Sequence, residues 1–212
     1  MMSITNMHPK TLSKETSAVL NLLKDSVSEF YLAGGTALAL ELGHRISIDL
    51  DFFSVNDFST QKIADRLKEK GHLEISSQDE DTLNGLLNGV KISFFKYPYQ
   101  LLSPTKEYGG VALADERDIA AMKILAISHR GSKKDFVDLF VLLKIYSLTD
   151  LLEFFNKKYK DYNYNTLHIL KSLLYFTDAD LDPEPMYINA IAWSEVKKTI
   201  KNVVEVCLKS QS

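Results

Sequence analysis

The fold is decided by one stretch of the chain, residues 31–53, which reads YLAGGTALALELGHRISIDLDFF. A short apolar strand leads into the turn Gly34-Gly35, and Thr36 then opens a short helix, because threonine is a common helix N-cap. A second apolar strand, predicted over residues 46–53, ends the stretch. The pattern therefore predicts a strand, a glycine turn, a helix and a second strand in one compact unit.

The second strand carries two carboxylates, Asp49 and Asp51. Side chains two apart on a strand share a face, with Cα atoms separated by roughly 6.6 Å. Such a pair can hold a divalent cation, and Mg²⁺ or Mn²⁺ prefers oxygen ligands. The alternative is a pair of solvated carboxylates at a strand end. The apolar flanks favour the metal site, because a buried carboxylate without a cation is costly.

The glycine turn places backbone N–H groups at the start of a helix, where an anion is stabilised. Gly34, Gly35 and the Thr36 hydroxyl are therefore expected to bind phosphate. Taken alone, such a turn is structural, because glycine is common wherever a chain bends sharply. A phosphate cradle and a metal pair in one unit together predict phosphoryl or nucleotidyl transfer.

This arrangement resembles the first motif of nucleotidyltransferases related to DNA polymerase β, which pair a Gly-Gly or Gly-Ser turn with a later Asp-x-Asp. More closely, the chain resembles the AbiEii/AbiGii nucleotidyltransferase-like toxin family, known from abortive-infection toxin–antitoxin pairs. The similarity continues in the segments AMKILAISHR and RGSKKDFVDLF, so that it covers about residues 30–145.

Lys123 is the most diagnostic residue outside the first motif. Every other residue from Ile119 to Ile127 is apolar, so the helix that they form is expected to be buried. A lysine in such a helix must extend to solvent or meet an anion. The resemblance places a motif lysine at Lys123 and implies that it contacts nucleotide phosphate.

Asp135 and Asp138 lie three residues apart and share a helix face. Asp135 could be a favourable contact with the helix dipole, and Asp138 could pair with Lys134. The resemblance implies instead that both belong to the active site, Asp135 on the nucleotide and Asp138 on Lys123, metal or nucleotide.

Many polymerase-β-like enzymes place a third carboxylate on a later strand. The corresponding strand here, residues 90–95, offers Ser93 and no acid. Asp138 is the candidate that completes the site; otherwise the chemistry is impaired.

Three further groups carry charge that could meet nucleic acid. Arg45 could bind nucleotide phosphate or form a salt bridge. The turn 129–134 is basic and suits a polyanion, but a solvated turn has the same composition. Residues 157–164 mix lysine with tyrosine, as single-stranded nucleic-acid sites do, although tyrosines packing on a helical core are more common.

Composition bounds the remaining classes. The chain has 212 residues, 45% hydrophobic, with a net charge of −3, so any contact with nucleic acid must use local patches. A single cysteine excludes an internal disulfide. No stretch approaches the ~20 apolar residues of a membrane span, and the first dozen residues lack a signal-peptide core. The cytoplasm is the expected location, with no membrane partner.

The expected fold is α+β. Residues 1–100 would form a polymerase-β-like core, a small mixed sheet backed by helices, with a hairpin at Asn88-Gly89. Residues 101–212 would form an all-helical half that contributes Lys123 and Asp138.

The resemblance implies a metal-dependent nucleotidyltransferase that moves a nucleoside monophosphate from an NTP to an acceptor hydroxyl. The implied acceptor is RNA, at the tRNA 3′ end, and a separately encoded antitoxin is the implied partner. Asp49, Asp51, Lys123 and Asp138 are the expected catalytic residues. Two alternatives stay open: a protein acceptor, or a nucleotide- or partner-binding protein in which catalysis is impaired.

Overall fold

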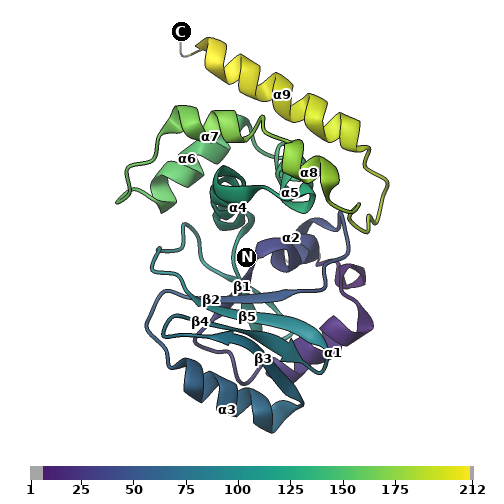
Figure 1. Ribbon diagram of the computed structural model, residues 1–212, viewed down its shortest axis with the longest axis vertical. Coiled ribbons are helices and arrows are strands. Elements are labelled where there is room, and N and C mark those ends of the chain that lie inside the picture. Colours follow the sequence, from purple (N-terminus) through teal and green to yellow (C-terminus); the bar gives the residue numbers. More distant parts are fainter. Residues whose placement is uncertain (1–6, 211–212) are drawn as a thin grey trace, which may run out of the picture. The chain divides into compact units, whose positions relative to one another are not determined.

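A computed structural model describes residues 7–210 of the chain (Figure 1). The chain divides between Asp115 and Glu116 into two compact units. This division lies beyond the expected boundary at residues 100/101, because the next two strands join the sheet of the first unit. Residues 1–6, part of the segment without a signal-peptide pattern, lie outside the described residues. Within the described residues, no helix has the length and apolar character needed to cross a membrane.

A seven-stranded mixed sheet forms the centre of the first unit, with the order β3-β4-β5-β2-β1-β7-β6. β2 pairs antiparallel with β1 and parallel with β5, so the expected mixed sheet is confirmed. The strands are β1 (Tyr31–Ala33), β2 (Leu50–Ser54), β3 (Leu73–Gln78), β4 (Thr82–Leu87), β5 (Val90–Lys96), β6 (Lys106–Tyr108) and β7 (Val111–Leu113).

The predicted hairpin at Asn88-Gly89 is confirmed and joins β4 to β5. Both turn residues adopt positive φ, 50° at Asn88 and 81° at Gly89. Asparagine and glycine tolerate this left-handed conformation better than other residues, which is why the pair favours a two-residue hairpin.

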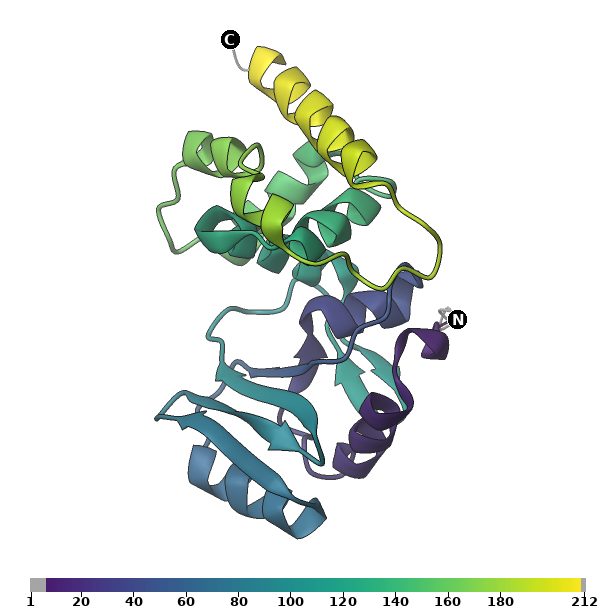
Figure 2. The same ribbon diagram turned by 45° about the vertical axis from the view of Figure 1, so that its right-hand side comes forward.

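One face of the sheet packs against helices. Phe52 of β2 and Phe94 of β5 are fully buried there, and their rings stack with centroids 5.0 Å apart. α3 runs alongside β3 and β4 (Figure 2) and begins after Ser59, whose hydroxyl accepts a hydrogen bond from Lys62 N. The helical elements of this unit are η1 (Pro9–Thr11), α1 (Lys14–Leu23), α2 (Gly34–Leu42) and α3 (Thr60–Lys70).

The carboxylate-bearing strand is shorter than the sequence predicts. β2 begins at Leu50, and the expected strand residues before it form an extended connection. Ser47 N donates to Thr11 O at 2.9 Å, so this connection is held by the N-terminal segment rather than by the sheet. Ile48 is 50% exposed, so the expected buried flank at this position is wrong.

The second unit is built from helices whose apolar faces meet. α4 packs against α5, α6 and α7, and α5 packs against α9. Phe136 and Leu139 of α5 are fully buried. The helices are α4 (Glu116–Arg130), α5 (Lys133–Leu142), α6 (Leu148–Lys158), α7 (Thr166–Ser172), α8 (Thr177–Leu181) and α9 (Trp193–Ser210).

Candidate active site

The two candidate metal ligands lie at the start of β2 in the first unit. Asp51 is the second residue of the strand, and Asp49 directly precedes it. Both residues are half-buried, in a sheet whose neighbouring positions Leu50 and Phe52 are fully buried. The sheet therefore places Asp51, whereas Asp49 belongs to the connection in front of β2, and both side chains remain within reach of solvent.

Gly34 brings the glycine turn against one of these carboxylates. A Cβ atom at Gly34 would lie 3.3 Å from Asp51 Oδ2, and its φ of 67° is in the left-handed region that favours glycine. α2 begins at Gly34, and the N-cap residue is Ala33, which has no side chain to cap the helix. The first backbone N–H groups of a helix have no intrahelical acceptor. A carboxylate and an anion-binding helix start thus meet at one point.

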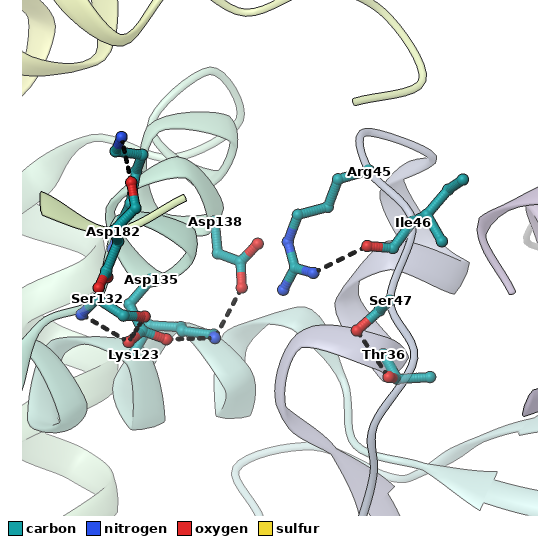
Figure 3. A network of polar contacts seen from close by, with 10 residues as sticks. Thr36, Arg45, Ile46, Ser47, Lys123, Ser132, Asp135, Asp138 and Asp182 are labelled. Atoms are coloured by element: carbon teal, nitrogen blue, oxygen red, sulfur yellow. Dashed lines mark hydrogen bonds and ion pairs between the residues drawn. The ribbon is translucent and has the colours of Figure 1, made fainter. Parts of the chain in front are cut away.

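The absence of a side chain at Gly35 leaves room for the Arg45 guanidinium beside the same turn. A Cβ atom at Gly35 would lie 2.0 Å from Arg45 Nη2, a distance that no side chain at this position could keep. Arg45 is only 4% exposed, and its Nη1 donates to Ile46 O at 3.2 Å (Figure 3). Arg45 therefore lies beside the glycine turn.

Thr36 differs from expectation in both position and contacts. It is the third residue of α2 rather than the residue that opens the helix, and it is 1% exposed. Its hydroxyl hydrogen-bonds with Ser47 Oγ at 2.8 Å (Figure 3) and with Asp49 O. The hydroxyl thus fixes the backbone in front of β2, and the anion-binding groups that remain at the turn are the backbone amides. Sequence reasoning missed Ser47, whose only signal is its alternation with Asp49 and Asp51.

Ser93 of β5 pairs in register with Asp51, so the position opposite this candidate metal ligand holds a hydroxyl, as expected. Within residues 7–210 there is no group of three or more histidine, cysteine or acidic residues able to hold a metal ion. Mg²⁺ is commonly bound through one or two carboxylates, with waters and substrate phosphates completing its shell. The oxygen donors Asp49 and Asp51, beside an anion-binding helix start, fit that mode of binding.

In the second unit, one ammonium lies between two carboxylates. Lys123 Nζ, on α4, is 2.8 Å from Asp135 Oδ1 and 2.7 Å from Asp138 Oδ2, both on α5 (Figure 3). The Lys123 and Asp138 side chains are 8% and 0% exposed. Lys123 thus meets anions instead of extending to water, and Asp138 is directed inward. The three groups, here called the lysine–carboxylate cluster, carry one positive and two negative formal charges.

Asp135 also caps α5. Its Oδ2 accepts hydrogen bonds from Ser132 N at 3.1 Å and from Ser132 Oγ at 2.6 Å. Burial by itself raises the pKa of this carboxyl, but Lys123 and the Ser132 hydroxyl outweigh it and hold the pKa below its ordinary value. Asp135 is therefore held ionised by the lysine that it orients.

The basic turn 129–134 does not present all of its charges. Lys133 is 5% exposed, and its Nζ lies 2.7 Å from Asp182 O and 3.0 Å from Glu184 Oε1. Its backbone N donates to Asp182 Oδ2 at 2.8 Å. Lys133 thus anchors the loop after α8, so its charge is not available to a polyanion at the basic turn.

Within residues 157–164, Lys158 and Tyr159 belong to the core, whereas most of the other residues are exposed. Lys158 pairs with Asp118 at 2.7 Å, and both side chains are fully buried. Tyr159 is 1% exposed, and its ring packs against Phe155. The more common alternative, tyrosines on a helical core, is confirmed for Tyr159 and for Tyr164, whose ring also packs on Phe155, but not for the exposed Tyr162. Sequence reasoning missed the partner of Lys158, since Asp118 lies forty positions earlier.

Comparison with known proteins supports a nucleotidyltransferase. The family model described as "Nucleotidyl transferase AbiEii toxin, Type IV TA system" matches residues 22–82 and 90–205. The uncharacterized protein aq_aa25 of Aquifex aeolicus is 39% identical over 195 residues, which cover 86% of this chain and 90% of that protein.

Two solved structures share the fold at low sequence identity. JHP933 from Helicobacter pylori superposes with a TM-score of 0.59 at 18% identity, covering 94% of each chain. MenT4, a nucleotidyltransferase toxin from Mycobacterium tuberculosis, superposes with a TM-score of 0.54 at 15% identity, covering 91% of this chain and 86% of MenT4. With the family match over most of its length, the chain belongs to the AbiEii family of nucleotidyltransferase toxins, from type IV toxin–antitoxin systems.

Proposed function

We propose that this toxin transfers a nucleoside monophosphate from an NTP to the 3′-terminal hydroxyl of an RNA, with tRNA as the acceptor. The reaction would depend on Mg²⁺ or Mn²⁺, and a separately encoded antitoxin would counteract it in the cytoplasm. One observation carries the proposal: the Asp51 carboxylate lies against the glycine turn at which α2 begins. A cation-binding group and an anion-binding group therefore meet where a metal-bound triphosphate has to sit.

In this proposal Asp49 and Asp51 hold the metal, and the amides of Gly34 and Gly35 bind triphosphate oxygens. Arg45 adds a charge-assisted contact at the same turn, since guanidinium groups recognise phosphate through several N–H donors. When bound, the divalent ion would stabilise phosphate charge and lower the pKa of the attacking hydroxyl.

Lys123 is proposed to stabilise negative charge on the leaving phosphates. Asp135 and Asp138 hold its ammonium at fixed distances, so the group does not have to be ordered when substrate binds. Asp138, the acid expected to complete the set, is buried in the second unit against Lys123, while the strand position opposite Asp51 in the first unit is Ser93.

Calorimetric titration with an NTP and Mg²⁺ tests this assignment. Wild-type protein should bind NTP in a metal-dependent manner, and Asp51→Asn should remove the metal dependence. Asp25→Asn removes the same charge from an exposed residue of the first unit and should leave binding unchanged. Thermal melts of the wild type and of every variant separate lost binding from lost folding. Metal-dependent binding that survives in both Asp49→Asn and Asp51→Asn would refute the metal site.

A catalytically impaired nucleotide-binding protein is the second candidate, and Ser93 is the observation that favours it. Binding of NTP without release of pyrophosphate in the presence of RNA or protein would support that candidate. Release of pyrophosphate with label on protein instead of RNA would keep the reaction and change the acceptor.

A further inference from the structure

The face of the sheet that carries Asp51 continues into a row of aromatic rings. Strand register places Ala33, Asp51, Ser93 and Asn84 side by side across β1, β2, β5 and β4. The next row on the same face, two residues along each strand, holds Tyr31, Phe53, Phe95 and Thr82. Rows two residues apart on a strand are separated by roughly 6.6 Å. The aromatic row is therefore the immediate neighbour of the row that holds the metal ligand Asp51.

The rings form a continuous strip that extends beyond the sheet. Phe53 lies 6.0 Å from Tyr31, 5.2 Å from Phe95 and 5.3 Å from Tyr97, measured between ring centroids. Tyr97 lies 4.6 Å from Tyr99. We call these five residues the aromatic strip. Tyr31 is buried and closes one end, whereas the other four rings are half-buried.

Partial exposure distinguishes the strip from ordinary core. Phe52 and Phe94, which point to the other face from the adjacent positions, are fully buried. On the strip's face, β5 alternates an exposed Lys91, a buried Ser93 and a half-buried Phe95. Aromatic rings on neighbouring strands, together with a lysine, are the groups that bind single-stranded nucleic acid, since every base has a π-face to stack.

We propose that the aromatic strip binds the unpaired 3′ end of the RNA acceptor by stacking on its terminal bases. The inference rests on the proposed function, which puts the acceptor hydroxyl beside Asp51. One NTP base needs one or two rings, but the strip has four half-buried rings and leads away from Asp51, as expected for consecutive bases of a strand. Each stacked base should strengthen binding about tenfold.

Anisotropy titrations of the full-length protein with a labelled single-stranded oligoribonucleotide test this inference. The reference ligand is the same oligonucleotide with abasic sites at its two 3′-terminal positions, which keeps every phosphate and removes the bases. Wild-type protein should prefer the intact oligonucleotide by about tenfold or more. Phe95→Leu and Tyr97→Leu should abolish this preference and leave affinity for the abasic ligand unchanged, whereas Tyr97→Phe should retain it.

Tyr162→Leu is the matched control, because this exposed tyrosine packs its ring on Tyr164 in the second unit. It should keep the full preference. An undiminished preference in folded Phe95→Leu and Tyr97→Leu proteins would overturn the inference, as would weaker NTP binding with RNA binding unchanged. Asp51→Asn should lose transfer and keep the preference. A preference in wild-type protein that transfers no nucleotide would therefore refute the proposed reaction and leave the strip standing.

Discussion

Replacing Lys123 by methionine leaves Asp135 and Asp138 without the ammonium that lies 2.8 and 2.7 Å from them. The side chains of Lys123, Asp135 and Asp138 are 8%, 14% and 0% exposed, so both ion pairs of Lys123 are buried rather than surface ion pairs. Surface pairs contribute about 0–1 kcal/mol, whereas removing one partner of a buried pair costs about 3–5 kcal/mol. Lys123→Met should therefore lower the free energy of unfolding by about 3–5 kcal/mol.

The loss should depend on pH with a definite sign. In wild-type protein, the lowered pKa of Asp135 contributes stability above its ordinary pKa of about 4, and this stability is lost as the pH falls through the folded value. Without Lys123, only the hydrogen bonds from Ser132 oppose the effect of burial, so the pKa of Asp135 should rise. The variant should then regain stability as its carboxyls are protonated. The difference between the two proteins should shrink between pH 7 and about pH 4.5.

Urea unfolding at both pH values measures the effect, with Lys157→Met as control. Lys157 is an exposed lysine of α6 that lies 3.8 Å from Glu153, and its replacement should cost less than about 1 kcal/mol. The double variant Lys123→Met/Asp138→Asn should recover part of the loss, because it removes one uncompensated charge. If Lys123→Met is as stable as wild type at pH 7, or if its deficit persists unchanged at pH 4.5, the reasoning is wrong.

Two further substitutions separate positioning from stability. Gly35→Ala puts a methyl group where Arg45 Nη2 lies, so calorimetry should show NTP affinity reduced about tenfold or more with only a small change in melting temperature; unchanged affinity would exclude Arg45 from the phosphate site. Lys158→Met leaves Asp118 buried without the Lys158 ammonium and should lower the free energy of unfolding in urea by about 3–5 kcal/mol, with unchanged NTP affinity per folded molecule. A decrease below about 1 kcal/mol would mean that water reaches the pair.

The sequence predicts those parts of the fold that local chemistry controls. α3 spans Thr60–Lys70, and the serine cap and the glycine that mark its two ends can be read from the sequence. The hairpin at Asn88-Gly89 follows from the backbone freedom of its two residues. β2 begins later than expected, because the backbone N–H of Ser47 donates to Thr11, which is distant in sequence, and not to a strand of the sheet.

The candidate site shows the same division. Asp49, Asp51 and the two glycines are near neighbours in sequence, and their spacing alone indicates a common site. Only the family resemblance suggested Asp138 as a partner of Lys123, and Asp135 was not proposed as one. Hydrophobic periodicity places a lysine in a buried helix without identifying its counterion. The sequence analysis assigned the Thr36 hydroxyl to phosphate. Its hydrogen bond to Ser47 could not be foreseen, because that bond forms only when the folded chain brings the two residues together.

Nucleotide transfer itself is the most direct test of the central claim. Wild-type protein and Asp51→Asn are incubated with Mg²⁺, each α-labelled NTP in turn and purified tRNA, and label at the RNA 3′ end is measured after electrophoresis. The account predicts that wild-type protein labels the 3′ end with at least one NTP, and that chelation of the metal or the Asp51→Asn change abolishes labelling in folded protein. Equal labelling by Asp51→Asn, or no labelling by wild-type protein with any NTP, would contradict it.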